Sequence, residues 1–445
     1  MSTQTAQRPS QDSRQRTRSC ATALVCHRCE NSYPLEQAIF ACPDCGKGLD
    51  VVYDYEHAAQ YFRDVPSSER PQNIWHFEEL LPIVDASAQA RVGQHSGYTP
   101  LIRADRLGAQ LGLSNLYLKD DSSNRPSLSY KDRVVSMSVA RLLERGGTEI
   151  GCVSTGNVGT ATASLAAKAG VDAYVFYPNR LEATKAAGCM ALGAKVCQVE
   201  GNYDEANRRC REVAEESGME FTNITLRPFY AEGAKTAAFE IVEQLDWHAP
   251  DHIVTAAAGG TLSSRLHKGL VELQLLGLAE TDPTRIHIAQ PSGCNPIATA
   301  IVAEEAEIRA VTPETAAHSL AIGNPGDGYL VIDAVLKRGG TGGFASDPEI
   351  FAGIDLLAAT EGLLTEPAGG TTIAVLEKLA ATGRLAPDDT VVAIITGNGL
   401  KTLDDHPPKP WPAKIDCELD AMVAALGELK SSGTLVDSAR RQLHS

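Results

Sequence analysis

Residues 149–170 read EIGCVSTGNVGTATASLAAKAG and contain the pattern that decides the fold. The apolar run at 149–154 predicts a buried β-strand, and the alanine-rich run at 158–169 predicts an α-helix. The turn between them, at 154–159, combines glycines with the N–H groups of a helix start. Such a turn favours a bound carboxylate or phosphate, and an ordinary helix N-cap is the alternative for this turn alone.

The same alternation of short apolar runs and longer helical runs continues from about residue 99 to 400. It predicts parallel sheets covered by helices and divided into two α/β domains. Ligands of such folds bind beyond the carboxyl ends of the strands, so the turns after predicted strands are candidate sites. The other predicted strands are 116–119, 172–178, 194–200, 252–258, 285–291 and 391–397, and the other predicted helices are 181–192, 204–217, 231–245 and 261–278.

Two more turns follow predicted strands. Residues 258–263, AGGTLS, combine a cluster of backbone N–H groups with two hydroxyls, which suits a phosphate dianion, and a tight β-α turn is the alternative. This turn lacks the Gly-Lys-Ser/Thr ending of a Walker loop and the spacing of a dinucleotide-binding loop, so nucleotide hydrolysis and hydride transfer lose support. Thr396, at the end of the last predicted strand, offers a hydroxyl to a ring nitrogen or another acceptor.

Residues 127–133, SLSYKDR, place Lys131 between a hydroxyl-rich turn and a predicted helix start. A lysine amine forms Schiff bases with carbonyl compounds, and a bound aldehyde cofactor that carries a phosphate needs one lysine and one anion-binding turn. Pyridoxal 5′-phosphate is such a molecule. The alternative for Lys131 alone is a solvated charge at a helix start, paired with Asp132.

Four of the eleven cysteines, Cys26, Cys29, Cys42 and Cys45, form two C-x-x-C pairs separated by twelve residues. Two such pairs complete a tetrahedral sulfur site suited to structural Zn2+. The other cysteines are scattered singly, which argues against a disulfide framework and for a reducing compartment. Unligated packing cysteines and a redox pair are the alternatives, although no thioredoxin-like strand and helix surround either pair.

The composition of the 445 residues, 43% hydrophobic and 22% charged, is that of a folded globular protein. The formal charge of −16 argues against nucleic-acid binding, which needs clustered lysine and arginine. The sequence contains no run of about 18 apolar residues, so it predicts no membrane-spanning helix. Residues 1–19 lack the apolar core of a secretory signal and predict a disordered tail. We therefore expect a cytoplasmic protein that binds neither nucleic acid nor membrane.

The motifs occur in an order that resembles a known family. SLSYKDR, VSTGNVG, AAAGGTLSS, PFYAEGAKTAAFEI, LAIGNP, EGLLTEPAGG and VVAIITGNGLK, behind a C-x-x-C ribbon, resemble threonine synthase and its close paralogues, which are fold-type-II pyridoxal-phosphate enzymes. The resemblance runs from about residue 24 to about 403. It implies a two-domain α/β fold of the tryptophan synthase β type, with parallel sheets flanked by helices, an N-terminal zinc ribbon and a homodimer. The expected division is a tail at 1–19, a ribbon at 20–55, a large cofactor-binding domain at 56–134 and 246–404, a small domain at 135–245 and a C-terminal extension at 405–445.

The resemblance also implies a role for each site residue. Lys131 is expected to hold pyridoxal phosphate as a Schiff base and later to carry protons, Asn157 to hydrogen-bond the ring hydroxyl, and Thr396 to face the pyridine nitrogen. The residues expected to bind the cofactor's phosphate are Ala258, Gly259, Gly260, Thr261, Leu262 and Ser263. The residues expected to bind the amino-acid substrate are Ser129, Ser154, Thr155, Gly156 and Val158.

The implied reaction converts O-phosphohomoserine and water into threonine and phosphate. Several residues depart from the family pattern: threonine synthases usually have Thr-Gly-Ser-Phe where 127–130 reads SLSY, threonine at Val158, asparagine at or near Leu262 and histidine at Asn398. The alternatives are therefore a cysteate synthase-like or other β-replacement enzyme that takes O-phosphoserine and a different nucleophile, a threonine/serine dehydratase-like lyase, and a non-catalytic binding paralogue.

Overall fold

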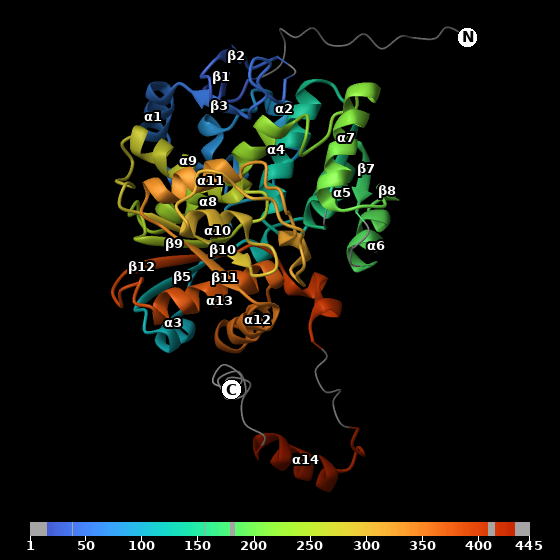
Figure 1. Cartoon of the computed structure of the whole chain (residues 1–445), viewed down its shortest axis with the longest axis vertical. Helices are drawn as coiled ribbons and strands as arrows, with labels where there is room; N and C mark the ends of the chain where they lie inside the picture. The colour runs from blue at the N-terminus through green and yellow to red at the C-terminus, as the bar shows by residue number, and fades with distance from the viewer. Residues whose placement is uncertain (1–15, 38, 155, 179–182, 408–413, 432–445) are drawn as a thin grey trace, which may run out of the picture. The chain divides into compact units, whose positions relative to one another are not determined.

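The computed structural model describes residues 16–37, 39–154, 156–178, 183–407 and 414–431. The chain divides into two compact units, whose elements Figure 1 labels. Unit 1 comprises Met1–Thr99, Asn124–His248 and Arg265–Thr281, and unit 2 comprises Pro100–Ser123, Ala249–Ser264 and Asp282–Ser445. The domain boundaries implied by the family resemblance stay a prediction, and most of the predicted tail lies outside the described residues.

Unit 2 is built on a six-stranded sheet with the order β11-β10-β9-β12-β5-β4. Neighbouring strands are parallel except β4 and β5, which pair antiparallel. A parallel strand is covered on both faces and therefore reads as a continuous apolar run, and every residue of β9 is buried. The strands are β4 (Leu101–Arg103), β5 (Asn115–Asp120), β9 (His252–Ala256), β10 (Arg285–Pro291), β11 (Gly342–Ala345) and β12 (Thr390–Ile395).

Helices cover this sheet, as Figure 1 shows for α13 and α11. Helix α13 packs along β9, β10, β11 and β12 and also against α12 and α3, whereas α10 and α11 pack on β10. The apolar core between α13 and the sheet includes the fully buried Ile373, Leu376 and Val391. The helices of unit 2 are α3 (Asp105–Leu111), α10 (Pro296–Val302), α11 (Gly328–Lys337), α12 (Asp347–Glu361), α13 (Pro367–Ala381) and α14 (Leu419–Ser431). Helix α9 (Thr261–Leu275) begins in unit 2 and belongs to unit 1 from Arg265 onward.

Unit 1 contains a parallel three-stranded sheet, β6-β7-β8, and an antiparallel ribbon, β2-β1-β3. Helices α5, α6 and α7 pack on the parallel sheet, and α4 packs against both α5 and α8. The strands are β1 (Ala21–Cys26), β2 (Ser32–Pro34), β3 (Leu49–Tyr53), β6 (Glu149–Val153), β7 (Asp172–Tyr177) and β8 (Lys195–Gln198). The helices are α1 (Tyr55–Asp64), α2 (Ala86–Arg91), α4 (Lys131–Glu144), α5 (Asn157–Ala169), α6 (Ala183–Ala191), α7 (Tyr203–Ser217) and α8 (Arg227–Gln244).

Short 3-10 turns join several of these elements. They are η2 (Ser67–Glu69), η3 (Ile74–Leu80), η4 (Asp121–Ser123), η5 (His318–Leu320), η6 (Gly399–Lys401) and η7 (Leu403–Asp405).

A buried ionic cluster ties the ribbon to α8 and to α9 within unit 1. The Asp50 carboxylate of β3 accepts a hydrogen bond from Arg265 of α9. The Glu232 carboxylate of α8 lies 2.6 Å from Lys268 Nζ and 2.7 Å from Lys235 Nζ. Buried charges of this kind are tolerated only when each is paired, because an uncompensated charge costs several kcal/mol. The cluster consists of Asp50, Glu232, Lys235, Arg265, Lys268 and Glu272, three acids and three bases.

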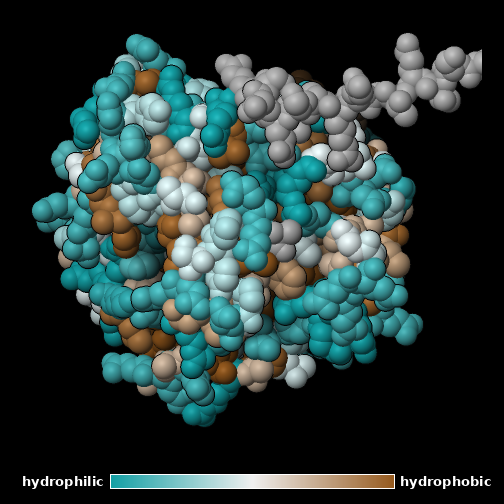
Figure 2. All heavy atoms as spheres, turned by 90° about the horizontal axis from the view of Figure 1, so that it is seen from above, coloured by the Kyte–Doolittle hydropathy of each residue, from teal (hydrophilic) through white to brown (hydrophobic). Residues whose placement is uncertain are grey.

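The strand and helix predictions are confirmed in their positions. Every apolar run that predicted a strand overlaps a strand, and every predicted helix overlaps a helix. The additional sheet strands β4 and β11 are short, and β11 contains two glycines, so neither has a clear apolar signal. Among the described residues, no helix is long and apolar enough to cross a bilayer, and hydrophilic and hydrophobic residues are interspersed on the face drawn in Figure 2.

Two histidines form a buried pair on neighbouring strands of the unit 2 sheet. His252 Nδ1 of β9 lies 2.9 Å from His287 Nε2 of β10, and the ring centroids are 5.1 Å apart. Burial lowers the pKa of His287 to about 3 and also lowers the pKa of His252, although Asp389 opposes the second shift. Both rings therefore stay neutral in the folded protein at neutral pH.

The histidine pair predicts a pH dependence of stability. The folded-state pKa of His287 lies below its unfolded value of about 6.5, so the unfolded chain takes up the proton first as the pH falls. The contribution of neutral His287 to the free energy of unfolding is fully present above about pH 6.5. It decreases from there towards pH 3, by up to about 1.4 kcal/mol per pH unit. We expect the urea midpoint of His287→Gln to fall less steeply than that of the unmodified protein between pH 7 and pH 5. Parallel pH profiles would contradict this expectation.

Candidate active site

Lys131 is the first residue of α4, directly after the serine-rich turn. Its amine donates a hydrogen bond to the Tyr130 hydroxyl and lies 4.2 Å from the centroid of the Tyr130 ring. Burial raises the pKa of Tyr230 on α8 to about 12, and the positive charge of nearby Lys131 opposes that rise. Within the described part of the chain Lys131 forms no ion pair, so its amine lies among phenol groups and is not paired with Asp132.

The turn before Lys131 is held in a compact shape by Asp132. Both carboxylate oxygens of Asp132 accept the N–H of Ser127, at 3.1 and 2.9 Å. Leu128 has φ of 58°, in the left-handed region that a leucine rarely adopts. The Ser127 and Ser129 hydroxyls are 3.1 Å apart, and Ser129 is fully buried. Strained turns of this kind gather at functional sites when the surrounding structure enforces them.

The loop after β6 caps the N-terminus of α5. The Ser154 hydroxyl accepts the N–H groups of Gly156 and Gly159 at 2.9 and 2.8 Å, so it satisfies two backbone N–H groups at the start of α5, whose N-cap residue is Gly156. Gly156 has φ of 139° and ψ of −86°, a conformation open essentially to glycine alone. Asn157 then begins α5 and is 5% exposed.

Lys185 of α6 lies against this loop. A Cβ added to Gly156 would lie 2.6 Å from Lys185 Cδ and 2.9 Å from Lys185 Nζ. Lys185 is buried. A lysine ammonium and the positive end of α5 therefore act at the same loop, and both favour an anion there.

A second candidate anion-binding turn lies between β9 and α9 in unit 2. The first backbone bond of α9 runs from the Ser264 N–H to the Gly260 carbonyl at 3.0 Å, so the N–H groups of Thr261, Leu262 and Ser263 point out of the helix N-terminus. Gly260 has φ of 96°, and a Cβ there would lie 2.9 Å from Val331 of α11. Glycine is therefore required at this position.

Thr396 follows β12 and lies beside an acidic residue. Its hydroxyl is 3.4 Å from Glu366 Oε1, and Glu366 is 2% exposed. A Cβ on Gly397 would lie 2.5 Å from the same carboxylate. The Thr396 hydroxyl and the Glu366 carboxylate are both able to hydrogen-bond a polar atom of a bound ring.

Each unit by itself carries groups with the chemistry that pyridoxal phosphate needs. Ser263 is 1% exposed, and its hydroxyl has no hydrogen-bond partner among the described residues. A buried polar atom without a partner is unusual, and this hydroxyl could donate to a phosphate oxygen. The helix N-terminus supplies further donors to that phosphate. Lys131 supplies the amine that an aldehyde requires.

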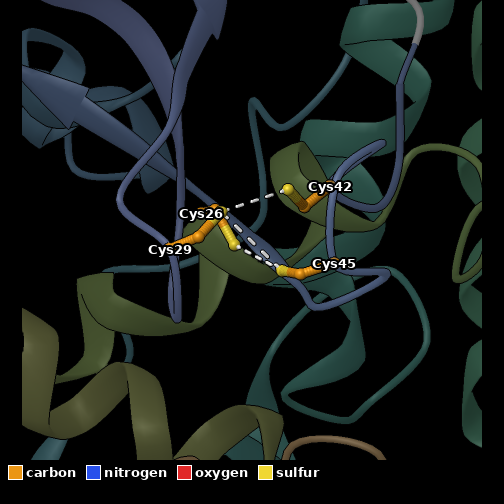
Figure 3. A group of neighbouring side chains, drawn as sticks. All are labelled: Cys26, Cys29, Cys42 and Cys45. Atoms are coloured by element: carbon orange, nitrogen blue, oxygen red, sulfur yellow. Dashed lines mark hydrogen bonds between the residues drawn. The ribbon is translucent and has the colours of Figure 1, made fainter.

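The four ribbon cysteines converge on one point (Figure 3). Their sulfur atoms all lie within 4.8 Å of one another, with Cys26 and Cys45 Sγ 3.4 Å apart and Cys29 and Cys42 Sγ 3.5 Å apart. A tetrahedral zinc site with Zn–S bonds of about 2.3 Å needs sulfur atoms separated by roughly 3.8 Å. The geometry is therefore compatible with a Zn2+ site.

The described site residues lie on four short segments, two in each unit. In unit 1, the turn that carries Ser129 leads into Lys131. Ser154 and Gly156 lie in the loop after β6, and Asn157 and the half-buried Val158 begin α5 directly after that loop. In unit 2, residues 258–263 form one turn and Thr396 ends β12. Thr155 lies outside the described residues.

The sequence analysis did not identify two residues that lie beside these segments, Lys185 and Glu366. Lys185 lies within a helical run that carries no glycine-rich turn, so no local signal marked it. Glu366 lies in the motif EGLLTEPAGG, which contributed to the resemblance without suggesting a role for the carboxylate.

Comparisons with known proteins match nearly the whole chain. A family model described as "Pyridoxal-phosphate dependent enzyme" matches residues 92–397. A threonine synthase of Methanocaldococcus jannaschii is 34% identical over 407 residues, which cover 91% of this chain and 99% of that protein. A threonine synthase of Methanosarcina acetivorans is 34% identical over 408 residues, covering 91% and 98%. One of Mycobacterium tuberculosis is 37% identical over 340 residues, covering 75% and 89%.

Solved structures share the fold at lower identity. Maize serine racemase has a TM-score of 0.60 and 19% identity, over 78% of this chain and 96% of that one. Diaminopropionate ammonia lyase from Escherichia coli has a TM-score of 0.60 and 20% identity, over 69% and 85%. O-ureido-L-serine synthase has a TM-score of 0.58 and 21% identity, over 74% and 97%.

The cysteine cluster predicts bound zinc. We expect the purified protein to contain about one zinc per chain by elemental analysis, and Cys42→Ser to lose it and to unfold at a lower temperature, because the metal joins segments of the ribbon. For cooperative unfolding of the 445 residues, a loss of about 2 kcal/mol corresponds to a Tm decrease of roughly 2 °C. Cys197→Ser, at an exposed cysteine outside the cluster, is the control and should retain the zinc. Zinc-free protein with an unchanged Tm after Cys42→Ser would contradict the metal site.

Proposed function

Because the chain belongs to the threonine synthase family of fold-type-II pyridoxal-phosphate-dependent enzymes, we propose that it expels phosphate from an O-phospho amino acid, converting O-phosphohomoserine and water into threonine and phosphate. The chain is a pyridoxal-phosphate-dependent lyase. The observation that carries the proposal is the Lys131 amine, which begins α4 and has no ion pair within the described residues.

We propose the following residues for the cofactor. Lys131 holds it covalently, the Asn157 amide binds the ring hydroxyl and the Thr396 hydroxyl faces the ring nitrogen, while 258–263 binds the phosphate. Pyridoxal phosphate, when bound, withdraws electrons from the α-carbon of an amino acid. The Lys131 amine then takes the proton from that carbon and returns it later in the reaction.

The loop 154–158 is proposed to bind the amino acid. The N-terminus of α5 offers N–H groups and a positive dipole end to the substrate carboxylate. Lys185 gives the same loop a second positive charge, which suits the phosphate that leaves. Ser129, buried two residues before Lys131, supplies a hydroxyl on the substrate side of the turn.

A β-replacement on O-phosphoserine, as in a cysteate synthase-like enzyme, is the second candidate. The observation that favours it is the Tyr130 hydroxyl, which hydrogen-bonds Lys131 at a position where threonine synthases usually have phenylalanine. A polar group beside the amine and Val158 beside Asn157 both change the surroundings of the substrate side chain.

The remaining parts of the proposal concern metal and assembly. The four ribbon cysteines are proposed to hold structural Zn2+, because no ligand position is left open for catalysis. The homodimer and the division into a large and a small domain rest on the family resemblance.

The cofactor proposal predicts a coloured protein. We expect the purified chain to be yellow and borohydride reduction to attach the cofactor to Lys131, as read by peptide mass spectrometry. Lys131→Ala should abolish this labelling and reduce phosphate release by at least about a thousandfold, because the covalent link and the proton carrier are both lost. Lys168→Ala, at an exposed lysine of α5, is the matched control and should stay yellow. If the purified protein is colourless and borohydride attaches no label to Lys131, the proposed enzyme function is wrong.

The substrate is decided by a phosphate-release assay. We expect release from O-phosphohomoserine in water, with threonine as the product identified by chromatography. O-phosphoserine, tested with and without sulfite, a thiol or an amine, distinguishes the second candidate, and a keto acid would reveal a dehydratase. Lys185→Met should raise KM for the phosphorylated substrate by about tenfold or more while cofactor binding is kept, because one charge-assisted contact is lost. Release from neither phospho-amino acid would exclude both candidates.

A further inference from the structure

Arg133 lies two residues after Lys131 and on the other side of the same helix. Successive residues of an α-helix are rotated by about 100°, so Lys131 and Arg133 project about 200° apart from the first turn of α4. The Arg133 side chain is fully buried, whereas Lys131 is partly accessible. The turn thus presents its amine on one side and is anchored on the other.

The anchor is a guanidinium that bonds to buried groups. Both terminal nitrogens of Arg133 donate to the carboxylate of Glu240 on α8, one of them at 2.8 Å. The same two nitrogens donate to the hydroxyls of Thr236 and Thr99, each at 2.9 Å. A forked pair between a guanidinium and a carboxylate defines orientation as well as distance.

Glu240 also holds the segment before β4. Its Oε1 accepts the Tyr98 N–H at 2.8 Å, and its Oε2 accepts the Thr99 N–H at 3.1 Å. Tyr98 has φ of 48°, so this segment follows an unusual path that the carboxylate enforces. One carboxylate, 1% exposed in its side chain, therefore joins α8, residues 98–99 and the first turn of α4.

The backbones of α4 and α8 also touch at this point. A Cβ added to Gly233 would lie 2.6 Å from the carbonyl carbon of Arg133 and 2.9 Å from Cα of Val134. Close approach of this kind needs glycine and leaves α4 little room to shift. The motif PFYAEGAKTAAFEI thus contributes Gly233, Thr236 and Glu240 to the surface that bears α4.

A buried ion pair often adds little to the stability of a protein, because apolar residues of equal volume in its place often give a protein that is at least as stable. What a closed, forked pair does supply is a defined position for the helix turn that bears it. Reacting groups displaced by about 1 Å lose rate by about a hundredfold, so the position of a reactive amine matters more than the stability of its helix.

We propose that Arg133 and Glu240 are positioning residues for Lys131, and that they hold the first turn of α4 so that the amine is presented to the cofactor and the substrate. The inference rests on the proposed role of Lys131. The three residues of the run Lys131-Asp132-Arg133 then have separate roles, in which the amine reacts, the carboxylate folds the preceding turn, and the guanidinium fixes the helix.

The test compares two buried ion pairs of unit 1. Arg133→Lys keeps the charge but loses the fork, and we expect the apoenzyme to take up pyridoxal phosphate at least tenfold more slowly, measured by stopped-flow absorbance, with kcat reduced more than KM is raised. Arg70→Lys is the matched control, because Arg70 forms an equally buried fork with Glu79, at 2.9 and 3.1 Å, away from Lys131. It should lower the Tm similarly and leave uptake within about twofold of the unmodified rate.

The outcomes separate this inference from the proposed function. If the unmodified apoenzyme takes up no cofactor, the proposed function itself fails. If it does and Arg133→Lys takes up cofactor like Arg70→Lys, the positioning role is overturned. If Arg133→Lys fails to fold, Thr236→Val is the variant that tests the positioning role. It removes the hydroxyl that accepts a hydrogen bond from Arg133 and keeps the shape of the side chain. Slower uptake at an unchanged Tm supports the inference, and uptake at the unmodified rate overturns it.

Discussion

Helix α8 is buried along nearly its whole length and still carries Glu232, Lys235 and Glu240, so each of these charges must find a partner inside the protein. The partners come from elsewhere in the chain. Glu232 and Lys235 pair with residues of α9 and, through them, with Asp50 of the ribbon, whereas Glu240 pairs with the turn that begins α4. The need to compensate charges on one helix thus organises the ribbon and the Lys131 turn at once.

The two anion-binding turns follow from one rule of parallel sheets. A strand that ends at its carboxyl edge and continues into a helix leaves the helix N–H groups and its positive dipole end facing outward. Unit 1 uses this arrangement at α5, where Lys185 adds a charge, and unit 2 uses it at α9, where the Ser263 hydroxyl adds a donor. We propose the first for the substrate and the second for the phosphate of the cofactor.

How much could be predicted depended on where the signal lies. Strands such as β9 and β12 were predictable because a buried parallel strand is a continuous apolar run, while β11, four residues with two glycines, carries no such signal. The glycine turns and Lys131 were recognisable because their chemistry is local in the sequence. Lys185, Glu366 and the Arg133–Glu240 pair were not, because their roles arise from contacts between segments distant in the chain, and a buried charge is indistinguishable in sequence from a solvated one.

Tyr130 stands directly before Lys131, where threonine synthases usually have phenylalanine. A phenol that is partly buried needs a hydrogen-bond partner, and here its partner is the reactive amine. A phenylalanine in its place would leave the Lys131 amine without this hydrogen bond. Asp132 and Arg133 hold the turn through contacts that do not involve the Tyr130 side chain, so a change at Tyr130 leaves those contacts intact and alters the polarity beside the Lys131 amine.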